Sequence, residues 1–405
     1  MSTLALNSPS LVARTKRRAK LLAVAWRDLA LIGFDGLIGM TSRAKLSGND
    51  VLIVRMDALG DFVLWLNAAR AIRLKYRDRR VVLWCDESVC ELARHVELFD
   101  EVIGVRPRRF RTELRYRAKM IRRLRAHRFG TVLHPVHSRE GDFADGESLV
   151  HAARSAEKIS FRVEQRTRGW RGVMSDRWYT HLLPTSQSEL MELRRNADFV
   201  RGLGVSDFMA DVPKLSSNPA RLDDYFVLFP GAGLAHRRWP ISNFIEIARR
   251  MHDHFELRGV ICGGPSERGI GESLRDALPE ILENRAGQTS LTDYVALLAG
   301  ARLVVTNDTS AAHIACATGT PSIVIVGGGE PGRFYPYQIE VPERRQVPLA
   351  VRQPMACDGC NWNCIYSIRA DEPFPCVAAV TVEQVWNQII SRFEPREAAT
   401  VSEAR

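Results

Sequence analysis

The chain alternates between short, continuous apolar runs and longer segments in which apolar residues recur every three or four positions. The apolar runs lie at 51–54, 81–84, 131–135, 225–229, 257–262, 303–305 and 322–326. The segments with helical periodicity lie at 62–76, from 88 onward, 241–254, 291–299 and 311–317. Short runs of this kind are typical of parallel strands buried on both faces, and their alternation with helices indicates βαβ units. We therefore predict an α/β protein with two doubly wound parallel sheets.

The alternation stops between Asp211 and Asp224, where proline, serine and asparagine interrupt the pattern, and then starts again. This interruption predicts a linker between two domains. We place a basic, amphipathic extension at 1–48, an N-terminal domain at 49–215 and a C-terminal domain at 222–380. A terminal helix at 381–394 and a tail at 395–405 complete the predicted organisation.

The segment 303–331 has the most distinctive pattern of the chain. An apolar strand ends at the polar cluster 307–310, and a helix of small residues follows until Gly319 and Pro321 end it. The polar cluster should lie at the carboxyl end of the strand and at the N-terminus of the helix. Peptide N–H groups and the helix dipole favour phosphate at such a place. The alternative is that Asp308 and Thr309 simply cap the helix.

The charge of the chain changes the picture from a generic α/β protein to one with an anionic partner. The formal net charge is +10 over 405 residues, and the segment 106–128 holds eleven Lys or Arg and a single carboxylate, Glu113. Apolar residues recur at helical spacing within it, so we predict one amphipathic helix with a cationic face. Phosphates or anionic lipid fit this charge. We expect no nucleic-acid partner, because aromatic interleaving and known nucleic-acid motifs are missing from the sequence.

The segment 14–40 begins with the basic sequence RTKRRAK and continues as a largely apolar stretch. Arg27, Asp28 and Asp35 interrupt that stretch, which therefore falls short of the ~20 uncharged residues of a spanning helix. On a helical wheel the charged residues share one sector, and Leu22, Ala25, Trp26, Leu29 and Ile32 fill the remainder. The pattern predicts either a helix that lies on a membrane surface or a helix packed on the protein body.

Four of the eight cysteines cluster near the C-terminus: Cys357, Cys360, Cys364 and Cys376. Their number and spacing are typical of a structural metal site, with zinc or iron as the ion. The alternative is a set of reduced cysteines or one disulfide in a packed loop. The other four lie in apolar or small-residue runs, which favours a reduced, cytoplasmic environment.

Three blocks of the sequence resemble one known family. VLIVRMDALGDFV (51–63), PGAGLAHRRWP (230–240) and NDTSAAHIACATGTP (307–321) are similar to the family 9 glycosyltransferases, the bacterial lipopolysaccharide heptosyltransferases. The resemblance covers roughly residues 49–390 and implies a GT-B fold, in which two Rossmann-like domains face each other across a cleft. It implies inverting transfer of a heptose from ADP-heptose, held by the C-terminal domain, to a lipid-anchored glycan held by the N-terminal domain. It implies no cofactor for catalysis.

The resemblance also assigns roles to individual residues. Asp61 matches the aspartate of the L-G-D turn and is the expected catalytic base, and Asp57 adds a second carboxylate where the family commonly has serine. The expected donor-binding residues are Gly231, Gly233, Arg237, Glu267, Thr289, Asp308, Thr309, Ser310 and His313. The expected acceptor-binding cations are Arg55, Arg109, Arg111, Arg115 and Arg122.

Two alternatives to lipopolysaccharide core synthesis remain open from the sequence. One is a heptosyltransferase that modifies protein, of the autotransporter type, for which the cysteine cluster is the main support. The other is a GT-B protein that binds a nucleotide or an anionic polymer without catalysis. For the leading hypothesis we expect a cytoplasmic protein, peripheral at the inner membrane.

Overall fold

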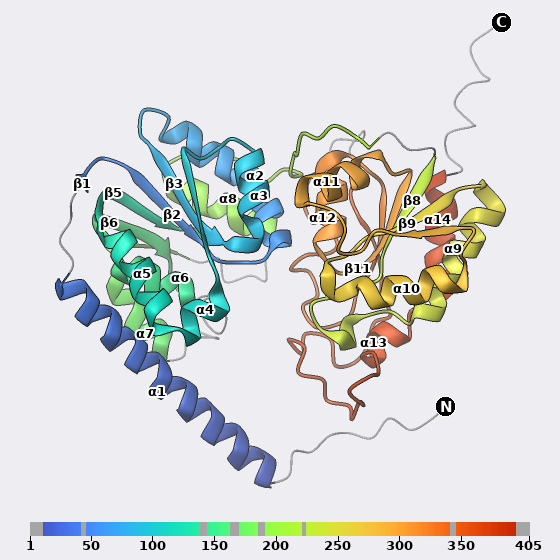
Figure 1. Cartoon of the computed structure of the whole chain (residues 1–405), viewed down its shortest axis with the longest axis horizontal. Coiled ribbons are helices and arrows are strands. Elements are labelled where there is room, and N and C mark those ends of the chain that lie inside the picture. The colour runs from blue at the N-terminus through green and yellow to red at the C-terminus, as the bar shows by residue number, and fades with distance from the viewer. Residues whose placement is uncertain are drawn as a thin grey trace, which may run out of the picture. The chain divides into compact units, whose positions relative to one another are not determined.

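The structure is a computed structural model that describes residues 11–41, 46–137, 144–162, 170–184, 191–220, 224–340 and 346–393. The chain divides into two compact units, an N-terminal unit (Ser8–Ala210) and a C-terminal unit that contains Asp211–Arg405. Each unit is built around a parallel β-sheet with helices packed on it (Figure 1). The predicted tail at 395–405 lies outside the described residues.

The N-terminal unit contains a seven-stranded parallel sheet in the order β4-β3-β2-β5-β6-β7, with β1 paired to β5. Its strands are β1 (Leu46–Ser47), β2 (Val51–Arg55), β3 (Val81–Asp86), β4 (Glu101–Val105), β5 (His127–His134), β6 (Arg154–Phe161) and β7 (His181–Leu183). Its helices are α1 (Leu11–Thr41), α2 (Leu59–Lys75), α3 (Cys90–His95), α4 (Pro107–Thr112), α5 (Leu114–Arg125), α6 (Ala144–Ala152), α7 (Trp170–Ser175) and α8 (Glu192–Gly202).

The order of these strands places a topological switch point between β2 and β5. Chain connections run from β2 through β3 to β4 on one side, and from β5 through β6 to β7 on the other. All five residues of β2 are buried, and Val51 pairs with both Val81 and Thr131. Ligands of doubly wound sheets bind outside the carboxyl ends of the strands at such a point. The segments after β2 and β5 are therefore the natural place for a site.

The cationic segment 106–128 differs from its prediction. It forms two helices, α4 and α5, separated at Glu113, whose backbone is extended (φ −113°, ψ 98°), and its last two residues already belong to β5. Phe110 of α4 and Ile121 of α5 are buried in the same hydrophobic core. The break allows both helices to turn apolar side chains toward this core. The periodicity of the sequence predicts one straight helix and does not reveal the break.

Helix α1 packs against α5 and α6, and its N-terminal turns extend beyond the body of the unit (Figure 1). Two contacts hold its C-terminal half: Asp35 forms a buried ion pair with Arg117 of α5, and Arg125 donates a hydrogen bond to the carbonyl of Gly39 (2.9 Å). Burial raises the pKa of the Asp35 carboxyl, although Arg117 opposes this effect. Among the described residues, every helix is too short or too polar to cross a bilayer.

The C-terminal unit repeats the same topology, with the strand order β10-β9-β8-β11-β12-β13 and a switch point between β8 and β11. Its strands are β8 (Tyr225–Phe229), β9 (Arg258–Ile261), β10 (Leu282–Asn284), β11 (Leu303–Asn307), β12 (Ser322–Ile325) and β13 (Leu349–Val351). Its helices are α9 (Ile241–Phe255), α10 (Arg268–Ala277), α11 (Leu291–Gly300), α12 (Ser310–Thr318), α13 (Pro375–Ala378) and α14 (Val382–Phe393). The α/β prediction, with two doubly wound parallel sheets, is confirmed.

One buried histidine of the N-terminal unit predicts a pH-dependent stability. His151 on α6 packs on the ring of Trp178 (centroids 4.4 Å apart), and burial, with help from Lys158 and Arg125, lowers its pKa to about 4. A lowered pKa gives stability that is present above the unfolded value of ~6.5 and is lost as the pH falls toward 4. Between pH 7 and pH 5 the free energy of unfolding should fall by about 1 kcal/mol more in the native chain than in His151→Phe. This figure is reduced from the full linkage value because His151 is partly exposed to solvent. Urea denaturation at both pH values measures this, and equal losses in the two proteins would contradict it.

Candidate active site

A cavity of about 690 Å³ lies at the carboxyl edge of the N-terminal sheet. The segment after β2 contributes Asp57, Ala58 and Leu59, and the first turn of α2 contributes Asp61. Asp86 at the end of β3 and Arg27 of α1 line it as well. The remaining lining residues are Met56, Ser88, Pro107, Arg108, Arg111 and Thr112. The cavity therefore combines carboxylates with guanidinium groups, a composition that suits a polar, anionic ligand with hydroxyl groups.

Asp57 and Arg55 form a buried ion pair beside this cavity. The Nη2 atom of Arg55 lies 2.7 Å from Oδ2 of Asp57, and its Nε lies 3.0 Å from Oδ1. Arg55 also donates to the carbonyl of Pro135 after β5 (2.9 Å), and its guanidinium stacks over the ring of Trp65 (4.9 Å). Burial raises the pKa of the Asp57 carboxyl, Arg55 opposes that effect, and Glu192 raises the pKa further. Arg55 thus joins the two sides of the switch point and holds Asp57 in place.

Asp61 is the acidic residue of the first turn of α2. Ala58, the N-cap residue of α2, has a methyl side chain that cannot cap the helix, whereas an acidic residue in the first turn, as Asp61 is, interacts favourably with the helix dipole. Arg55 donates a hydrogen bond to the backbone carbonyl of Asp61 (3.2 Å), which ties this turn to the Arg55–Asp57 pair. Asp57 and Asp61 therefore line one cavity from neighbouring turns, as two candidates for a base.

The predicted acceptor cations fall into three groups. Arg111 lines the cavity and forms an ion pair with the buried Asp145 (2.6 Å), whereas Arg109 lies on the surface of α4 in an ion pair with Glu113. Arg115 and Arg122 are exposed on α5 and are not among the cavity-lining residues described above. Arg55 is buried in its ion pair and is placed to position Asp57. Arg108, which the sequence analysis did not single out, lines the cavity beside Arg111.

At the switch point of the C-terminal sheet, Arg237 and Asp308 form an ion pair. Arg237 follows β8 and Asp308 follows β11; the Nη2 atom of Arg237 lies 2.6 Å from Oδ2 of Asp308. Burial raises the pKa of the Asp308 carboxyl, and Arg237 opposes this effect. Among the described residues, the buried Nε atoms of Arg237 and Arg238 have no hydrogen-bond partner. Both atoms are donors that a phosphate oxygen of a ligand could satisfy.

Helix α12 begins at the same place. Thr309 is its N-cap, and its side chain accepts a hydrogen bond from the backbone of Ala311 (3.3 Å), while Ser310 is the first helical residue. Asn307 at the end of β11 is fully buried: its side chain donates to the carbonyls of Pro230 (2.8 Å) and Gly231 (3.1 Å). The loop after β8 is thereby held against the start of α12, whose N-terminal N–H groups and dipole favour a phosphate.

The other predicted donor residues surround this point unevenly. Glu267 lies in the loop after β9, where its carboxylate accepts from the backbone of Gly264 (3.0 Å) and lies 3.8 Å from Arg238. Gly231 is required by this arrangement, because a Cβ there would lie 2.5 Å from the side chain of Glu267. Gly233 is exposed with open space around its Cα, and Thr289 lies half-buried in the turn before α11.

His313 lies one turn into α12 and is buried in an aromatic cluster. Its Nδ1 lies 2.8 Å from the hydroxyl of Tyr337, and its ring stacks on that of Tyr335 (centroids 5.1 Å apart, planes 6° apart). This cluster supports α12 from the side of β12. The structure therefore places His313 as a residue that braces the helix whose N-terminus carries Thr309.

The geometry of both switch points agrees with what comparison with known proteins finds. A family model described as "Glycosyltransferase family 9 (heptosyltransferase)" matches residues 149–350, the segment that contains both Arg237 and Asp308. The chain belongs to glycosyltransferase family 9. The resemblance inferred from three sequence blocks is confirmed.

Curated relatives in this family share limited stretches with the chain. "Lipooligosaccharide heptosyltransferase 2" of Haemophilus influenzae is 35% identical over 107 residues, which is 25% of this chain and 31% of that relative. "Lipopolysaccharide heptosyltransferase 1" of Pseudomonas aeruginosa is 27% identical over 301 residues, or 70% of this chain and 79% of that protein. The aligned part of the chain thus spans about a third of the length of the first of these relatives.

Solved structures of heptosyltransferases show the fold. The Escherichia coli heptosyltransferase WaaC with ADP-2-deoxy-2-fluoro heptose aligns with a TM-score of 0.63 and 19% identity, covering 84% of this chain and 99% of WaaC. E. coli heptosyltransferase II aligns with a TM-score of 0.60 and 17% identity, covering 85% and 98%. The family 9 chain therefore has the GT-B fold.

Trp362 is a residue of this site that the sequence analysis missed. Its ring lies under the guanidinium of Arg237 (4.1 Å), and its Nε1 donates to Glu330 (3.1 Å). Gly329, after β12, is packed against it so closely that a Cβ would lie 2.3 Å from the indole. The signal was present in the sequence: an aromatic residue inside the cysteine cluster, opposite a run of three glycines.

The structure brings the four clustered cysteines to one place, and the metal site stays a prediction. The four thiols Cys357, Cys360, Cys364 and Cys376 line one small cavity, but Met355, Trp362 and Phe374 line the same cavity. Among the described residues, no group of three or more His, Cys, Asp or Glu side chains is arranged to hold a metal ion. A tetrahedral thiolate site requires sulfur atoms that converge at ~2.3 Å from one ion. The same loop also carries Trp362, which lies against Arg237.

Proposed function

We propose that this family 9 chain is an inverting glycosyltransferase that transfers a heptose from ADP-heptose to an anionic, lipid-linked glycan of the lipopolysaccharide core type. The observation that carries this proposal is the Arg237–Asp308 ion pair at the ends of β8 and β11, directly before the first turn of α12. The guanidinium of Arg237 and the N-terminal N–H groups of α12 are donors that suit a diphosphate. The nucleotide and sugar are taken from the relatives, since WaaC has been solved with ADP and with an ADP-heptose analogue.

The C-terminal unit would bind the donor. The diphosphate would contact Arg237 and the first turn of α12, and the carboxylate of Asp308 would accept hydrogen bonds from hydroxyls of the sugar. Glu267 and Thr289 would lie beside the nucleoside. As the glycosidic bond to ADP breaks, negative charge develops on the departing phosphate, and Arg237 stabilises it.

The N-terminal unit would bind the acceptor in the cavity lined by Asp61, Arg108 and Arg111. Asp61 takes the proton from an acceptor hydroxyl, whose oxygen attacks the anomeric carbon from the face opposite ADP. One carbon–oxygen bond forms, the bond to ADP breaks, and the electron pair of that bond leaves with ADP. The arginines pair with phosphate or carboxylate groups of the acceptor. A peripheral position at an anionic membrane surface would suit an acceptor of this kind.

The purified full chain tests this proposal directly. It is incubated with ADP-heptose and a delipidated lipopolysaccharide-core acceptor, and the release of ADP is followed. We expect turnover that depends on both substrates, with inversion at the anomeric carbon visible in the NMR spectrum of the product.

Two results would contradict the proposal in different ways. A chain that binds ADP-heptose and releases no ADP with any core acceptor would exclude the acceptor class and leave protein acceptors to be tried. A chain that binds no ADP-sugar at all would exclude the donor. UDP-sugars and GDP-sugars serve as the matched comparison in the same assay.

A further inference from the structure

Helix α1 turns its acidic side toward the protein and its apolar side toward solvent, which is the reverse of an ordinary surface helix. Its two acidic residues, Asp28 and Asp35, are buried toward the body of the N-terminal unit. The residues of the segment 23–40 that are exposed are Ala23, Trp26, Arg27, Leu29, Ala30, Gly33, Gly36, Leu37 and Met40. Within this segment, Arg27 is therefore the single charged residue on the outer face. A surface helix normally presents polar residues to water.

The outer face of α1 forms a continuous apolar stripe, which we define as Trp26, Leu29, Gly33, Leu37 and Met40. At 100° per residue these five positions fall within a sector of about 80°. The large side chains are 72%, 44%, 59% and 76% exposed for Trp26, Leu29, Leu37 and Met40, respectively. A contiguous apolar face of this kind marks a surface that contacts another apolar phase.

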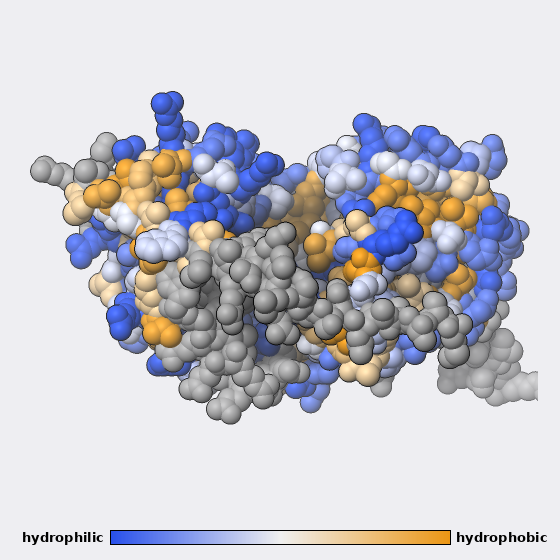
Figure 2. Space-filling view, turned by 90° about the horizontal axis from the view of Figure 1, so that it is seen from below, coloured by the Kyte–Doolittle hydropathy of each residue, from blue (hydrophilic) through white to orange (hydrophobic). Residues whose placement is uncertain are grey.

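This concentration is specific to α1. Apolar side chains reach the surface of both units among hydrophilic ones (Figure 2), but four of the eleven large exposed hydrophobic residues among the described residues lie in the stripe. The helix is also held in this orientation, because the Asp35–Arg117 pair and the Arg125–Gly39 hydrogen bond fix its polar side to the body. The stripe therefore cannot turn inward without breaking the buried Asp35–Arg117 ion pair.

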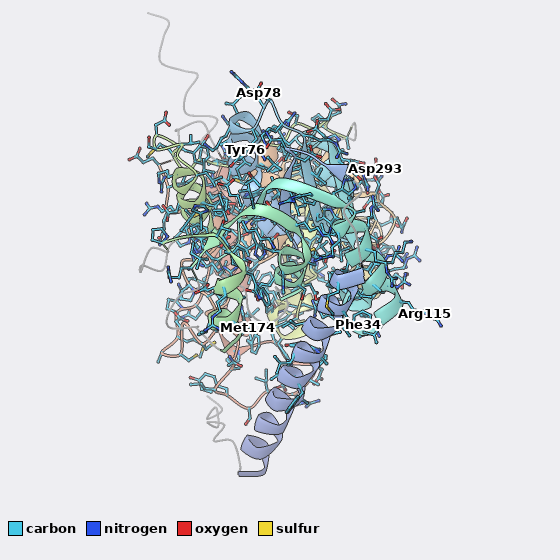
Figure 3. All side chains as sticks on the ribbon, turned by 90° about the vertical axis from the view of Figure 1, so that its left-hand side faces the viewer. Phe34, Tyr76, Asp78, Arg115, Met174 and Asp293 are labelled. Atoms are coloured by element: carbon cyan, nitrogen blue, oxygen red, sulfur yellow. The ribbon has the colours of Figure 1, made fainter. Side chains whose placement is uncertain are left out.

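The charge around the stripe indicates what covers it. The first turns of α1 contain the sequence RTKRRAK, with five Lys or Arg and no acidic residue. Arg115, Lys119 and Arg122 are exposed on α5, against which α1 packs, and Phe34 of α1 lies near the start of α5, where Arg115 is located (Figure 3). A second copy of the chain would bring the same cations together and be repelled. An anionic lipid surface satisfies both the stripe and the cations.

We propose that α1 is an interfacial membrane anchor: its apolar stripe inserts among the lipids of an anionic bilayer, while its acidic side stays on the protein. Arg27, on the flank of this stripe, lines the acceptor cavity of the N-terminal unit. The anchor thus places the mouth of that cavity at the lipid surface, where the head group of a lipid-linked acceptor is found. The anchoring itself does not depend on the glycosyltransferase function. Only the placement of the cavity next to a lipid-linked acceptor rests on the proposed function.

The test is binding of the full chain to vesicles without donor or acceptor. Vesicles of phosphatidylglycerol and phosphatidylethanolamine are compared with phosphatidylcholine vesicles in a flotation assay. The variant Leu37→Gln/Met40→Gln removes apolar surface from the stripe without changing charge. Its matched control is Leu74→Gln/Met209→Gln, which changes two exposed residues of the same types elsewhere in the same unit. We expect the stripe variant to partition about tenfold more weakly and the control to stay within about twofold of the native chain.

The native chain should also bind anionic vesicles more strongly than phosphatidylcholine vesicles, and less strongly as salt is raised. Equal binding of the stripe variant and the native chain would overturn the proposal, as would native protein that remains with the lipid-free fraction. Light scattering of lipid-free protein tests whether a second copy of the chain covers the stripe instead. If the native chain is a dimer and the stripe variant is a monomer, the stripe serves self-association. Turnover of a delipidated acceptor should be unchanged in the stripe variant, so a failure of anchoring and a failure of the proposed activity remain distinguishable.

Discussion

Asp61→Asn is expected to lower the turnover number of the family 9 chain about 10²–10⁴-fold, with the affinity for donor unchanged within about twofold. The carboxylate of Asp61 lines the N-terminal cavity from the first turn of α2. Asparagine keeps the size of the side chain and removes the ability to accept a proton. The measurement is steady-state release of ADP, with donor affinity from calorimetry of the same preparations.

Two other carboxylates of the same cavity make this prediction specific. Asp86→Asn is the matched control, because Asp86 lines the cavity while its side chain accepts from the backbone of Ser88 (2.8 Å), a role that asparagine keeps. It should retain most of the activity. Asp57→Asn removes the partner of a buried Arg55 and should lower the free energy of unfolding by about 3–5 kcal/mol.

The two candidates for the base are separated by comparing these variants. Full activity in Asp61→Asn, together with an inactive but folded Asp57→Asn, would transfer the role to Asp57. In that case the acid limb of the pH–rate profile should lie above the ordinary range of an aspartate, because burial raises the pKa of Asp57. Loss of activity in Asp86→Asn to the same degree would instead indicate a general effect on the cavity.

Arg237→Ala is the second substitution with a large expected effect. It should weaken ADP binding about 10–100-fold and lower turnover about 10²–10³-fold, because one charged hydrogen-bonding group then disappears from both the ground state and the departing phosphate. It also leaves the buried Asp308 without its cation. Arg237→Lys keeps the charge and should recover part of the affinity. Arg249→Ala, which removes an exposed arginine of α9, is the surface control.

Trp362 provides a readout of how Arg237 is positioned. Trp362→Leu should weaken ADP binding about 3–30-fold through the loss of the ring beneath the guanidinium, and Trp362→Phe should recover part of this loss. Calorimetry with ADP measures both, and thermal denaturation shows whether the loop remains folded. Unchanged ADP affinity in Arg237→Ala would contradict the proposed contact between Arg237 and the phosphate, regardless of the result for Trp362→Leu.

The alternation of apolar runs with amphipathic segments by itself determined the fold class of this chain and the positions of its polar clusters. Parallel strands buried on both faces must read as continuous apolar runs, and the residue after such a run must lie at the carboxyl edge of its sheet. For this reason Asp57 and Asp61 after β2, and Asp308 after β11, were identifiable without coordinates. The cap at Thr309 follows from the same local rules, whereas the glycine at 231 is explained only by its contact with Glu267.

Tertiary structure decided what those rules cannot reach. Arg55 reads as a cation for the acceptor, yet it is buried because the loop after β5 and Asp57 both satisfy it. The cysteine spacing predicts metal ligands, and the structure adds that Met355, Trp362 and Phe374 line the same cavity and that Trp362 lies against Arg237. In α1 the helical wheel separates charged from apolar residues and does not say which side faces the protein. The ion pair between Asp35 and Arg117, two residues 82 positions apart, makes that choice, and it turns the apolar stripe outward.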